Sequence, residues 1–293
     1  MPELPEVETT VRGLRKKVTG LKIVGFWCDW PGIIRYIPPV KLAREIKNTK
    51  IISINRRGKN ILVNLANKKT LVIHMKMTGH LMYGEYELVN KKWRAINPGP
   101  LRDDPYNQYI HAVFVFNKNH LVFCDARKFG KIAIHDTANL HTSSELSKLG
   151  PELWETTARQ FVKLLRTKNK AKIKPALLNQ EIIAGVGNIY ADESLWASGI
   201  HPLSIINKIP EAKLRTLHQA LNKITKASLK TGGDSTSDYR NVSGERGMSH
   251  NFHRVYQQTG KPCRKLGCHG IITRITVAMR GTHVCAEHQV LYD

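Results

Sequence analysis

The stretch QEIIAGVGNIYADESLWASGIHP occupies residues 180–202 and decides the architecture of the second half of the chain. Its GVG triplet at 185–187 predicts a tight turn, and Asn188 heads the helix that follows. Backbone N–H groups at a helix start, together with an asparagine amide, form a site for an anion. The run KNKAKIK at 168–174 adds lysines upstream. The pattern therefore predicts a two-turn phosphate site between helices.

Helical segments surround this site from about residue 143 to residue 231. They are punctuated by Gly and Pro, and the expected helices lie within 143–150, 157–168, 174–180, 189–199 and 210–233. Residues 232–254 are rich in Gly, Ser, Asn and Asp, which is typical of a mobile loop. This part of the chain is therefore expected to be a mostly helical domain followed by a loop.

The N-terminal half is expected to be a β-sandwich or barrel. One helix comes first, because Val7, Val11, Leu14 and Val18 form an apolar stripe at helical spacing and Gly20 is a plausible stop. Short apolar or alternating runs follow, separated by turn residues. The expected strands lie within 21–28, 49–57, 59–66, 69–77, 112–117, 120–126 and 131–136, and residues 83–110 are expected to be a long irregular loop.

Three cysteines near the C-terminus predict a metal site. The spacing is Cys263-x4-Cys268-x16-Cys285-x2-His288, which matches a zinc ribbon with two ligand pairs on one tetrahedral ion. Disulfides are the alternative, and they are disfavoured in a chain without a secretion signal. His283 competes with His288 for the fourth position, and the tighter Cys-x2-His spacing favours His288.

A hairpin is expected between the two ligand pairs, in ITRITVAMRGTHVC. We expect its turn at residues 280–282, with Arg280 held at the tip by the metal site. A surface arginine without a function is the alternative.

The net charge indicates a polyanionic partner. The chain of 293 residues carries 46 Lys+Arg against 23 Asp+Glu, a formal charge of +23, spread along its whole length. Nucleic acid is the first expectation and a membrane surface the second. No apolar run approaches the roughly 20 residues that span a bilayer, and the first residues lack the features of a signal peptide. A soluble, intracellular protein is expected.

Seven stretches together resemble bacterial formamidopyrimidine-DNA glycosylases, in order and from end to end. They are MPELPEVETTVRGL, RRGK (56–59), HMKMTG (74–79), DARKFG (125–130), LGPEL (149–153), GVGNIYADESLWASGIHP (185–202) and MRGTHVC. The related endonuclease VIII branch usually begins PEGPE, so Leu4 favours the formamidopyrimidine branch. The resemblance implies an α+β fold with three parts: an N-terminal β-sandwich with flanking helices (1–136), a helix-two-turns-helix domain with a lesion-capping loop at 232–254 (137–254), and a zinc finger (255–293).

The resemblance also implies an activity and its catalytic residues. The family removes oxidised purines from duplex DNA and then cuts at the abasic site. Pro2, exposed by removal of Met1, would be the nucleophile, and Glu3 the general acid/base. Lys59 and Arg280 would assist at the lesion phosphates. The implied cofactor is one structural zinc ion, and the implied setting is a monomer bound to damaged double-stranded DNA in a bacterial-type cytoplasm, associated with the nucleoid.

The DNA-binding residues follow from the same resemblance. Three side chains would fill the gap that a flipped nucleotide leaves in the duplex: Met77, Arg127 and Phe129. Asn188 would hold the DNA backbone, and Lys170 and Lys174 lie near positions where family members place lysines on DNA. Tyr109 stands near a position where many members carry a DNA-contacting histidine.

The chain departs from the family pattern at several points. The first cysteine pair has four intervening residues instead of two, and His288 replaces a cysteine. The segment 80–110 is roughly fifteen residues longer than expected, and Ser237 stands where a basic residue is common. Two other functions stay open: an endonuclease VIII-like enzyme for oxidised pyrimidines, and a non-catalytic protein that binds DNA or RNA.

Overall fold

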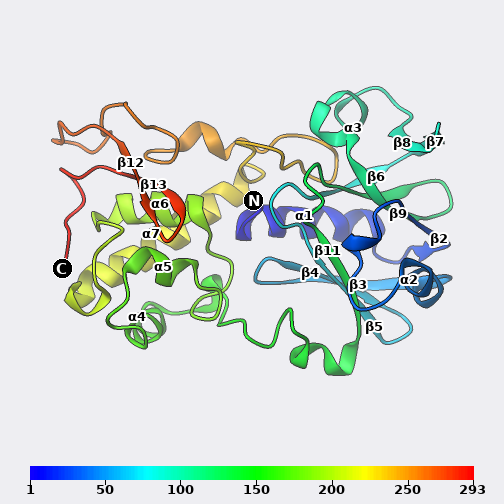
Figure 1. The fold of residues 1–293 in the computed structure, drawn as a ribbon, viewed down its shortest axis with the longest axis horizontal. Helices are drawn as coiled ribbons and strands as arrows, with labels where there is room; N and C mark the ends of the chain where they lie inside the picture. Colours follow the sequence, from blue (N-terminus) through cyan, green and yellow to red (C-terminus); the bar gives the residue numbers. More distant parts are fainter. The chain divides into compact units, whose positions relative to one another are not determined.

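The computed structural model describes residues 1–293 and divides them into two compact units. The first unit comprises Met1–Ser147 and Thr231–His250, and the second comprises Lys148–Lys230 and Asn251–Asp293 (Figure 1). The segment 231–250 therefore belongs with the N-terminal part, whereas the sequence-based division placed it with the helical part. We describe the two units separately.

The first unit is built on two antiparallel sheets, so the predicted sandwich is confirmed. The five-stranded sheet has the order β1-β3-β4-β5-β11, and the four-stranded sheet has the order β2-β9-β10-β6. The expected strand at 21–28 breaks at Val24, and its halves join different sheets. The strands are β1 Lys22–Ile23, β2 Gly25–Cys28, β3 Thr49–Arg57, β4 Asn60–Leu65, β5 Lys69–His74, β6 His80–Gly84, β9 Ile110–Val115, β10 His120–Cys124 and β11 Lys131–Asp136.

Helix α1, Leu4–Val18, carries the predicted apolar stripe into the core of this unit. Its Val7, Val11, Leu14 and Val18 are all fully buried. The helix contacts β3 and β4 of one sheet and β6 of the other. Burying a side chain of this size stabilises a fold by about 1.5–3 kcal/mol. This stripe therefore fixes the position of the chain's first residues. The shorter helical elements of the unit are η1 Pro31–Ile33, α2 Pro39–Ile46 and η3 Thr137–Thr142.

The segment 83–110 is not the irregular loop that the sequence predicts. It forms a hairpin followed by two helical turns: β7 Tyr86–Val89, β8 Lys92–Ala95, α3 Pro100–Asp103 and η2 Pro105–Gln108. Asn90 and Lys91 form its two-residue turn, with φ of 49° and 64°. Only Tyr86 and Ala95 of the hairpin are buried, and its strands have four residues each, which is a weak signal for a strand.

The second unit is helical, with a short hairpin near the C-terminus. Residues 143–150, which lie on both sides of the unit boundary, form turns instead of the expected helix. The elements are η4 Leu153–Glu155, α4 Ala158–Arg166, α5 Ile173–Leu178, α6 Asn188–Ser198, η5 Ile206–Lys208, α7 Glu211–Lys230, β12 Thr273–Val277 and β13 Arg280–Val284, and η6 Ser249–Phe252 lies at the boundary. Helix α6 contacts α5, α7 and β13, so it is the centre of the unit. No helix of either unit is both long and apolar enough to cross a membrane.

Candidate functional site

The first residues of the chain are buried at the start of α1. Pro2 is buried, and Glu3 is 2% exposed. The backbone N–H of Glu3 donates to Oε2 of Glu6 at 2.8 Å, and the N–H of Asp234 donates to Oε1 of the same side chain at 2.8 Å. A carboxylate in the first turn of a helix is also favoured by the helix dipole. Glu6 therefore positions both the N-terminus and the start of the segment 231–250.

The segment 231–250 packs closely on the N-terminal part of the first unit. A Cβ on Gly13 of α1 would lie 2.3 Å from Cγ2 of Val242, so this helix position admits only glycine in the present packing. Arg240 is 2% exposed, and its Nε lies 2.7 Å from Oδ2 of Asp104. No local pattern predicts these contacts, because they join residues more than 100 positions apart.

Lys59 lies in the tight turn between β3 and β4, and its side chain is almost wholly buried. The turn is joined to α1 through Arg56. The Nε of Arg56 lies 3.2 Å from Oε2 of Glu8, and its Nη1 donates to the backbone carbonyl of Gly58 at 2.9 Å. The structure therefore holds the Lys59 turn against the helix that begins directly after the buried Glu3.

His74 is a further titratable group of this region that the sequence does not single out. Burial, then the charges of Lys76 and Lys59, lower the pKa of His74 to about 3. Its Nδ1 accepts a hydrogen bond from the backbone N–H of Lys76 at 2.9 Å, so Nε2 carries the proton. The ring is therefore a neutral neighbour of Lys59 at neutral pH.

Two loops carry the three predicted gap-filling residues, and Asp125 joins them. Met77 is half-buried between β5 and β6, whereas Arg127 and Phe129 are exposed between β10 and β11. The fully buried Asp125 accepts hydrogen bonds from Oγ1 of Thr78 and from the N–H of Arg127. The Arg127 guanidinium lies over the Phe129 ring, 4.8 Å from its centroid. The two loops that carry these residues are therefore joined within the first unit.

Tyr109 lies beside the same loops. Its side chain is 48% exposed, and its backbone carbonyl accepts a hydrogen bond from the N–H of Asp125 at 2.8 Å. Tyr109 ends the segment 83–110, so this segment leads directly to the Asp125 loop.

In the second unit, Gln180 organises the two turns before α6. Its Nε2 donates to the carbonyl of Val186 at 2.8 Å, and its Oε1 accepts from the N–H of Gly185 at 2.9 Å. Asn188 is the first residue of α6, and its Nδ2 donates to the carbonyl of Gly281 at 3.0 Å. The predicted phosphate-binding turn is thus connected directly to the β12–β13 hairpin.

The hairpin turn lies earlier than expected. Ala278 and Met279 form it, with φ of 48° and 59°, and Arg280 is the first residue of β13. The glycine suggested a turn at 280–282, but Gly281 is paired within the hairpin. Because Gly281 has no side chain, the side chain of Arg274 can lie against it. A Cβ at Gly281 would lie 2.7 Å from Nη2 of Arg274. Arg280 itself is exposed.

Lys174 is not available to DNA, because its ammonium group is already paired inside the second unit. Its side chain is fully buried, and Nζ lies 2.5 Å from Oδ1 of Asp192 and 2.6 Å from Oγ1 of Thr282. The other Asp192 oxygen accepts from the N–H of His283 at 2.9 Å. The prediction of a DNA contact is therefore corrected to a buried ion pair between helices and hairpin. Lys170, in contrast, is exposed after α4.

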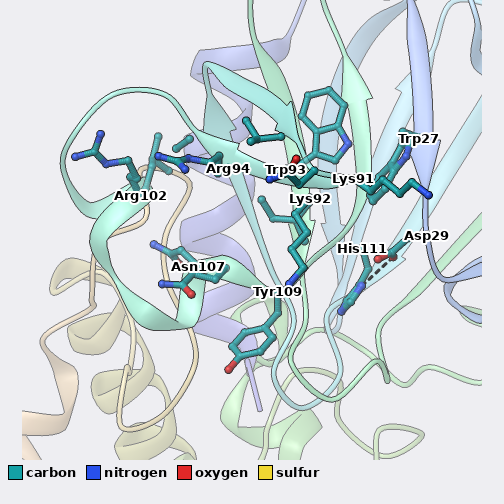
Figure 2. Close-up of a pocket in the computed structure, with 16 residues that line it drawn as sticks. Trp27, Asp29, Lys91, Lys92, Trp93, Arg94, Arg102, Asn107, Tyr109 and His111 are labelled. Carbon is teal, nitrogen blue, oxygen red and sulfur yellow. Dashed lines mark hydrogen bonds and ion pairs between the residues drawn. The ribbon is translucent and has the colours of Figure 1, made fainter.

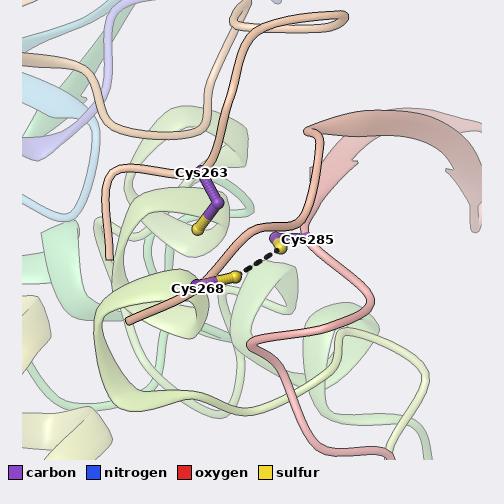
Figure 3. A group of neighbouring side chains, drawn as sticks. All are labelled: Cys263, Cys268 and Cys285. Carbon is purple, nitrogen blue, oxygen red and sulfur yellow. Dashed lines mark hydrogen bonds between the residues drawn. The ribbon is translucent and has the colours of Figure 1, made fainter. Parts of the chain in front are cut away.

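The three predicted cysteine ligands come together. The Sγ atoms of Cys263, Cys268 and Cys285 all lie within 4.8 Å of one another (Figure 3). Those of Cys268 and Cys285 are 3.6 Å apart, which matches the edge of about 3.8 Å in a tetrahedron with metal–sulfur bonds of about 2.3 Å. All three are free thiols, and a disulfide bond would need about 2.05 Å. The cluster can therefore bind a metal ion.

Neither histidine joins this cluster in the structure. Nε2 of His288 lies 2.7 Å from the carbonyl of Trp196, and its ring packs edge-on against that indole. His283 instead contacts Asp192 through Nδ1 at 3.3 Å. His288 thus keeps Nδ1 for another partner, whereas His283 is part of the buried network of Lys174.

Two family models match the chain. The formamidopyrimidine-DNA glycosylase N-terminal domain matches residues 1–132, and the formamidopyrimidine-DNA glycosylase H2TH domain matches residues 149–240. The fold, the buried N-terminus and the two-turn region thus define a DNA glycosylase of the helix-two-turns-helix class.

Relatives and solved structures agree with this class over nearly the full length. The formamidopyrimidine-DNA glycosylases of Solibacter usitatus and Lactiplantibacillus plantarum are 36% and 35% identical, and each alignment covers 99% of this chain and at least 99% of the relative. A Lactococcus lactis Fpg mutant in complex with Fapy-dG DNA matches with a TM-score of 0.85 and 32% identity, covering 98% of this chain and 99% of that one. The L. lactis Fpg complex with DNA containing an abasic site matches with a TM-score of 0.84.

This chain belongs to the formamidopyrimidine-DNA glycosylase family, whose members are enzymes that act on damaged DNA.

Proposed function

We propose that this enzyme removes oxidised purines, chiefly 8-oxoguanine and formamidopyrimidines, from duplex DNA and then cleaves the strand by β,δ-elimination. The observation that carries the proposal is the buried N-terminus, where Glu6 holds the backbone of Glu3. The similarity to an L. lactis enzyme solved with Fapy-dG DNA supports the lesion class.

Pro2 would be the nucleophile once Met1 has been removed. An α-amino group has a pKa near 8, compared with about 10.4 for lysine, so much more of it is neutral at pH 7. Its nitrogen attacks C1′ of the deoxyribose, and the bond from C1′ to the base breaks. The departing base takes the proton that the amine gives up. The C1′–O4′ bond then opens as O4′ gains a proton, and because proline is a secondary amine the open-chain product is an iminium ion. The positive nitrogen then accepts electrons as a proton leaves C2′ and the 3′ phosphate departs.

Glu3 would donate a proton to the sugar ring oxygen as the ring opens, and would move protons in the later steps. Its 2% exposure excludes most water from the carboxyl. Lys59, held against α1 through Arg56, would meet the lesion phosphates. In the second unit, Arg280 and Asn188 would hold the flanking phosphates, and the bond from Asn188 to Gly281 supports a joint role.

Met77, Arg127 and Phe129 would fill the duplex after the damaged nucleotide is flipped. Apolar side chains offset the few kcal/mol that unstacking a base step costs. Arg127 can bond the edge of the unpaired base, and its loop is ordered by Asp125. Tyr109 and Lys170, both exposed, would contact the DNA.

The metal would be one structural zinc ion, held by Cys263, Cys268 and Cys285, with His288 as the fourth ligand that the sequence spacing favours. Three thiolates and one imidazole are a donor set that suits zinc. A ligating histidine usually donates its other N–H to a carbonyl or carboxylate, as Nε2 of His288 is placed to do toward Trp196. A zinc ion at this position would connect the segment before β12, which carries Cys263 and Cys268, with Cys285, which follows β13.

A competition between lesions tests the proposed substrate class. Duplexes containing 8-oxoguanine and thymine glycol are mixed in equal amounts, and excision of each is followed in single turnover. We expect faster excision of 8-oxoguanine. Preference for thymine glycol would establish the endonuclease VIII-like alternative, and binding without any excision would establish the non-catalytic one.

A further inference from the structure

The segment 83–110 helps to form a cavity of about 1130 Å³ in the first unit (Figure 2). Of the residues given catalytic or DNA-binding roles above, only Tyr109 lines it. Small-molecule pockets usually measure about 300–1,000 Å³, so this cavity is slightly larger than that range. Its size admits a nucleotide.

The cavity is strongly basic. Its charged lining consists of four cations and one carboxylate: Lys91, Lys92, Arg94, Arg102 and Asp29. The two arginines have acidic neighbours, at 3.8 Å for Arg94 and 3.0 Å for Arg102. Lys91 and Lys92 are exposed and form no ion pair. These two ammonium groups are therefore the cations available to an anionic ligand.

The hairpin that carries the lysines is anchored. The Trp93 ring packs edge-on against Trp27 of β2, with centroids 6.1 Å apart, and lies 4.9 Å from the ring of His120 on β10. Its turn has two residues in the left-handed conformation, the geometry that matches the twist of paired strands. The lysines thus project from a fixed element beside the sheet.

Tyr109 supplies an aromatic surface on the same cavity. Its ring is about half exposed, whereas the two tryptophans are packed against neighbours. Figure 2 shows the Lys92 side chain extending toward Tyr109. A cation beside an exposed aromatic ring is the combination with which proteins bind single strands: the cation meets the phosphate, and a base stacks on the ring.

We propose that this cavity binds single-stranded DNA, with phosphates on Lys91 and Lys92 and one unstacked base on Tyr109. This proposal rests on the proposed function, because it assumes that the enzyme's ligand is DNA. Taking a paired base out of its stack costs free energy, whereas a base in a single strand is already available, so a single strand fits better than a duplex. An acidic peptide would use the lysines but would leave the tyrosine without a role.

Salt-dependent binding of a fluorescent oligothymidine of about ten nucleotides tests this proposal. The test variant is Lys91→Asn/Lys92→Ala, because asparagine tolerates the left-handed turn position. The matched control is Lys16→Ala/Lys17→Ala, an exposed lysine pair at the end of α1. Each phosphate contact contributes about −0.7 to the slope of log K against log salt for single strands. We expect the slope of the test variant to be shallower by about 1.4 and that of the control to be unchanged.

Tyr109 gives a second, independent comparison. Tyr109→Ala should weaken oligothymidine binding at least about fivefold, whereas Tyr109→Phe should retain it. Equal slopes for wild type and the Lys91/Lys92 variant would overturn the proposal. Normal oligothymidine binding by Tyr109→Ala would also overturn it if a polyglutamate peptide displaced the oligonucleotide from wild type but not from the Lys91/Lys92 variant. Single-turnover excision by the Lys91/Lys92 variant at saturating enzyme should equal wild type. If wild type excises no damaged base, the proposed function fails, but the oligothymidine comparison still tests the proposal for this cavity.

Discussion

Glu6 accepts a hydrogen bond from the backbone N–H of Glu3 with one carboxylate oxygen and from the N–H of Asp234 with the other, each at 2.8 Å. The side chain is 1% exposed. One buried carboxylate therefore connects the start of the chain, where the proposed nucleophile lies, with the segment 231–250. The position of that segment and the geometry of the N-terminus are coupled through Glu6.

Glu6→Gln tests this coupling. The amide nitrogen of glutamine would face one of the two backbone N–H groups, which would lose its acceptor. A buried donor left without a partner costs about 1–3 kcal/mol, so the free energy of unfolding in urea should fall by that amount, and single-turnover excision should slow. Glu85→Gln, an exposed change in the same unit, should stay within about 0.5 kcal/mol of wild type. Equal stability of the two variants would contradict the role of Glu6.

The Lys174–Asp192 pair predicts strong and non-additive effects. Lys174→Ala leaves the Asp192 carboxylate buried without its cation, which costs about 3–5 kcal/mol. Lys174→Ala/Asp192→Ala should cost less than the sum of the two single changes, as measured by urea denaturation. Lys170→Ala, at an exposed site, should leave stability unchanged and weaken DNA binding instead. Additive effects of the pair would show that the two charges do not depend on each other.

Asp125 should control both loops that carry the gap-filling residues. Asp125→Ala removes the acceptor for Oγ1 of Thr78 and for the N–H of Arg127, with an expected loss of about 1–3 kcal/mol. Affinity for lesion-containing duplex should also fall, because Met77 and Arg127 lose their support. Asp238→Ala, at a partly exposed aspartate of the same unit, serves as the comparison. Normal affinity in Asp125→Ala would show that the loops keep their shape without this carboxylate.

Two histidines predict loss of stability in mild acid. Burial, with the nearby lysine charges, lowers the pKa of His74 to about 3, and burial lowers that of His80 to about 4. In the unfolded chain both groups have a pKa near 6.5, so between about pH 6.5 and pH 4 the unfolded state binds more protons. The free energy of unfolding should therefore fall with pH, by up to about 1.4 kcal/mol per pH unit for each group. His74→Gln should make this dependence shallower, and an unchanged slope would contradict the assignment.

The sequence was most informative where a pattern repeats within one element. The stripe of α1 and the short apolar runs predicted the helix and seven of the strand-forming stretches, because burial on one face imposes a period. The cysteine spacing predicted the cluster for a similar reason, because a zinc ribbon binds its tetrahedral ion with two pairs of ligands and the members of each pair are close together in the sequence.

Three features were beyond such patterns. The hairpin of 86–95 has strands of only four residues, and only Tyr86 and Ala95 are buried in it. Lys174 lay in a basic run that suggested DNA, but its buried partner Asp192 is 18 positions away on the next helix. The bond from Glu6 to Asp234 spans 228 positions, and nothing local to either residue reveals it.

The central claim is that Pro2 forms the covalent bond to the damaged sugar, and borohydride trapping tests it most directly. The protein is compared with Met1 removed and with its N-terminus blocked by a fused tag, each incubated with abasic duplex and borohydride. We predict a covalent protein–DNA adduct only for the form with a free Pro2, with mass spectrometry placing the sugar on the N-terminal peptide. An adduct of equal yield from the blocked protein would contradict the account.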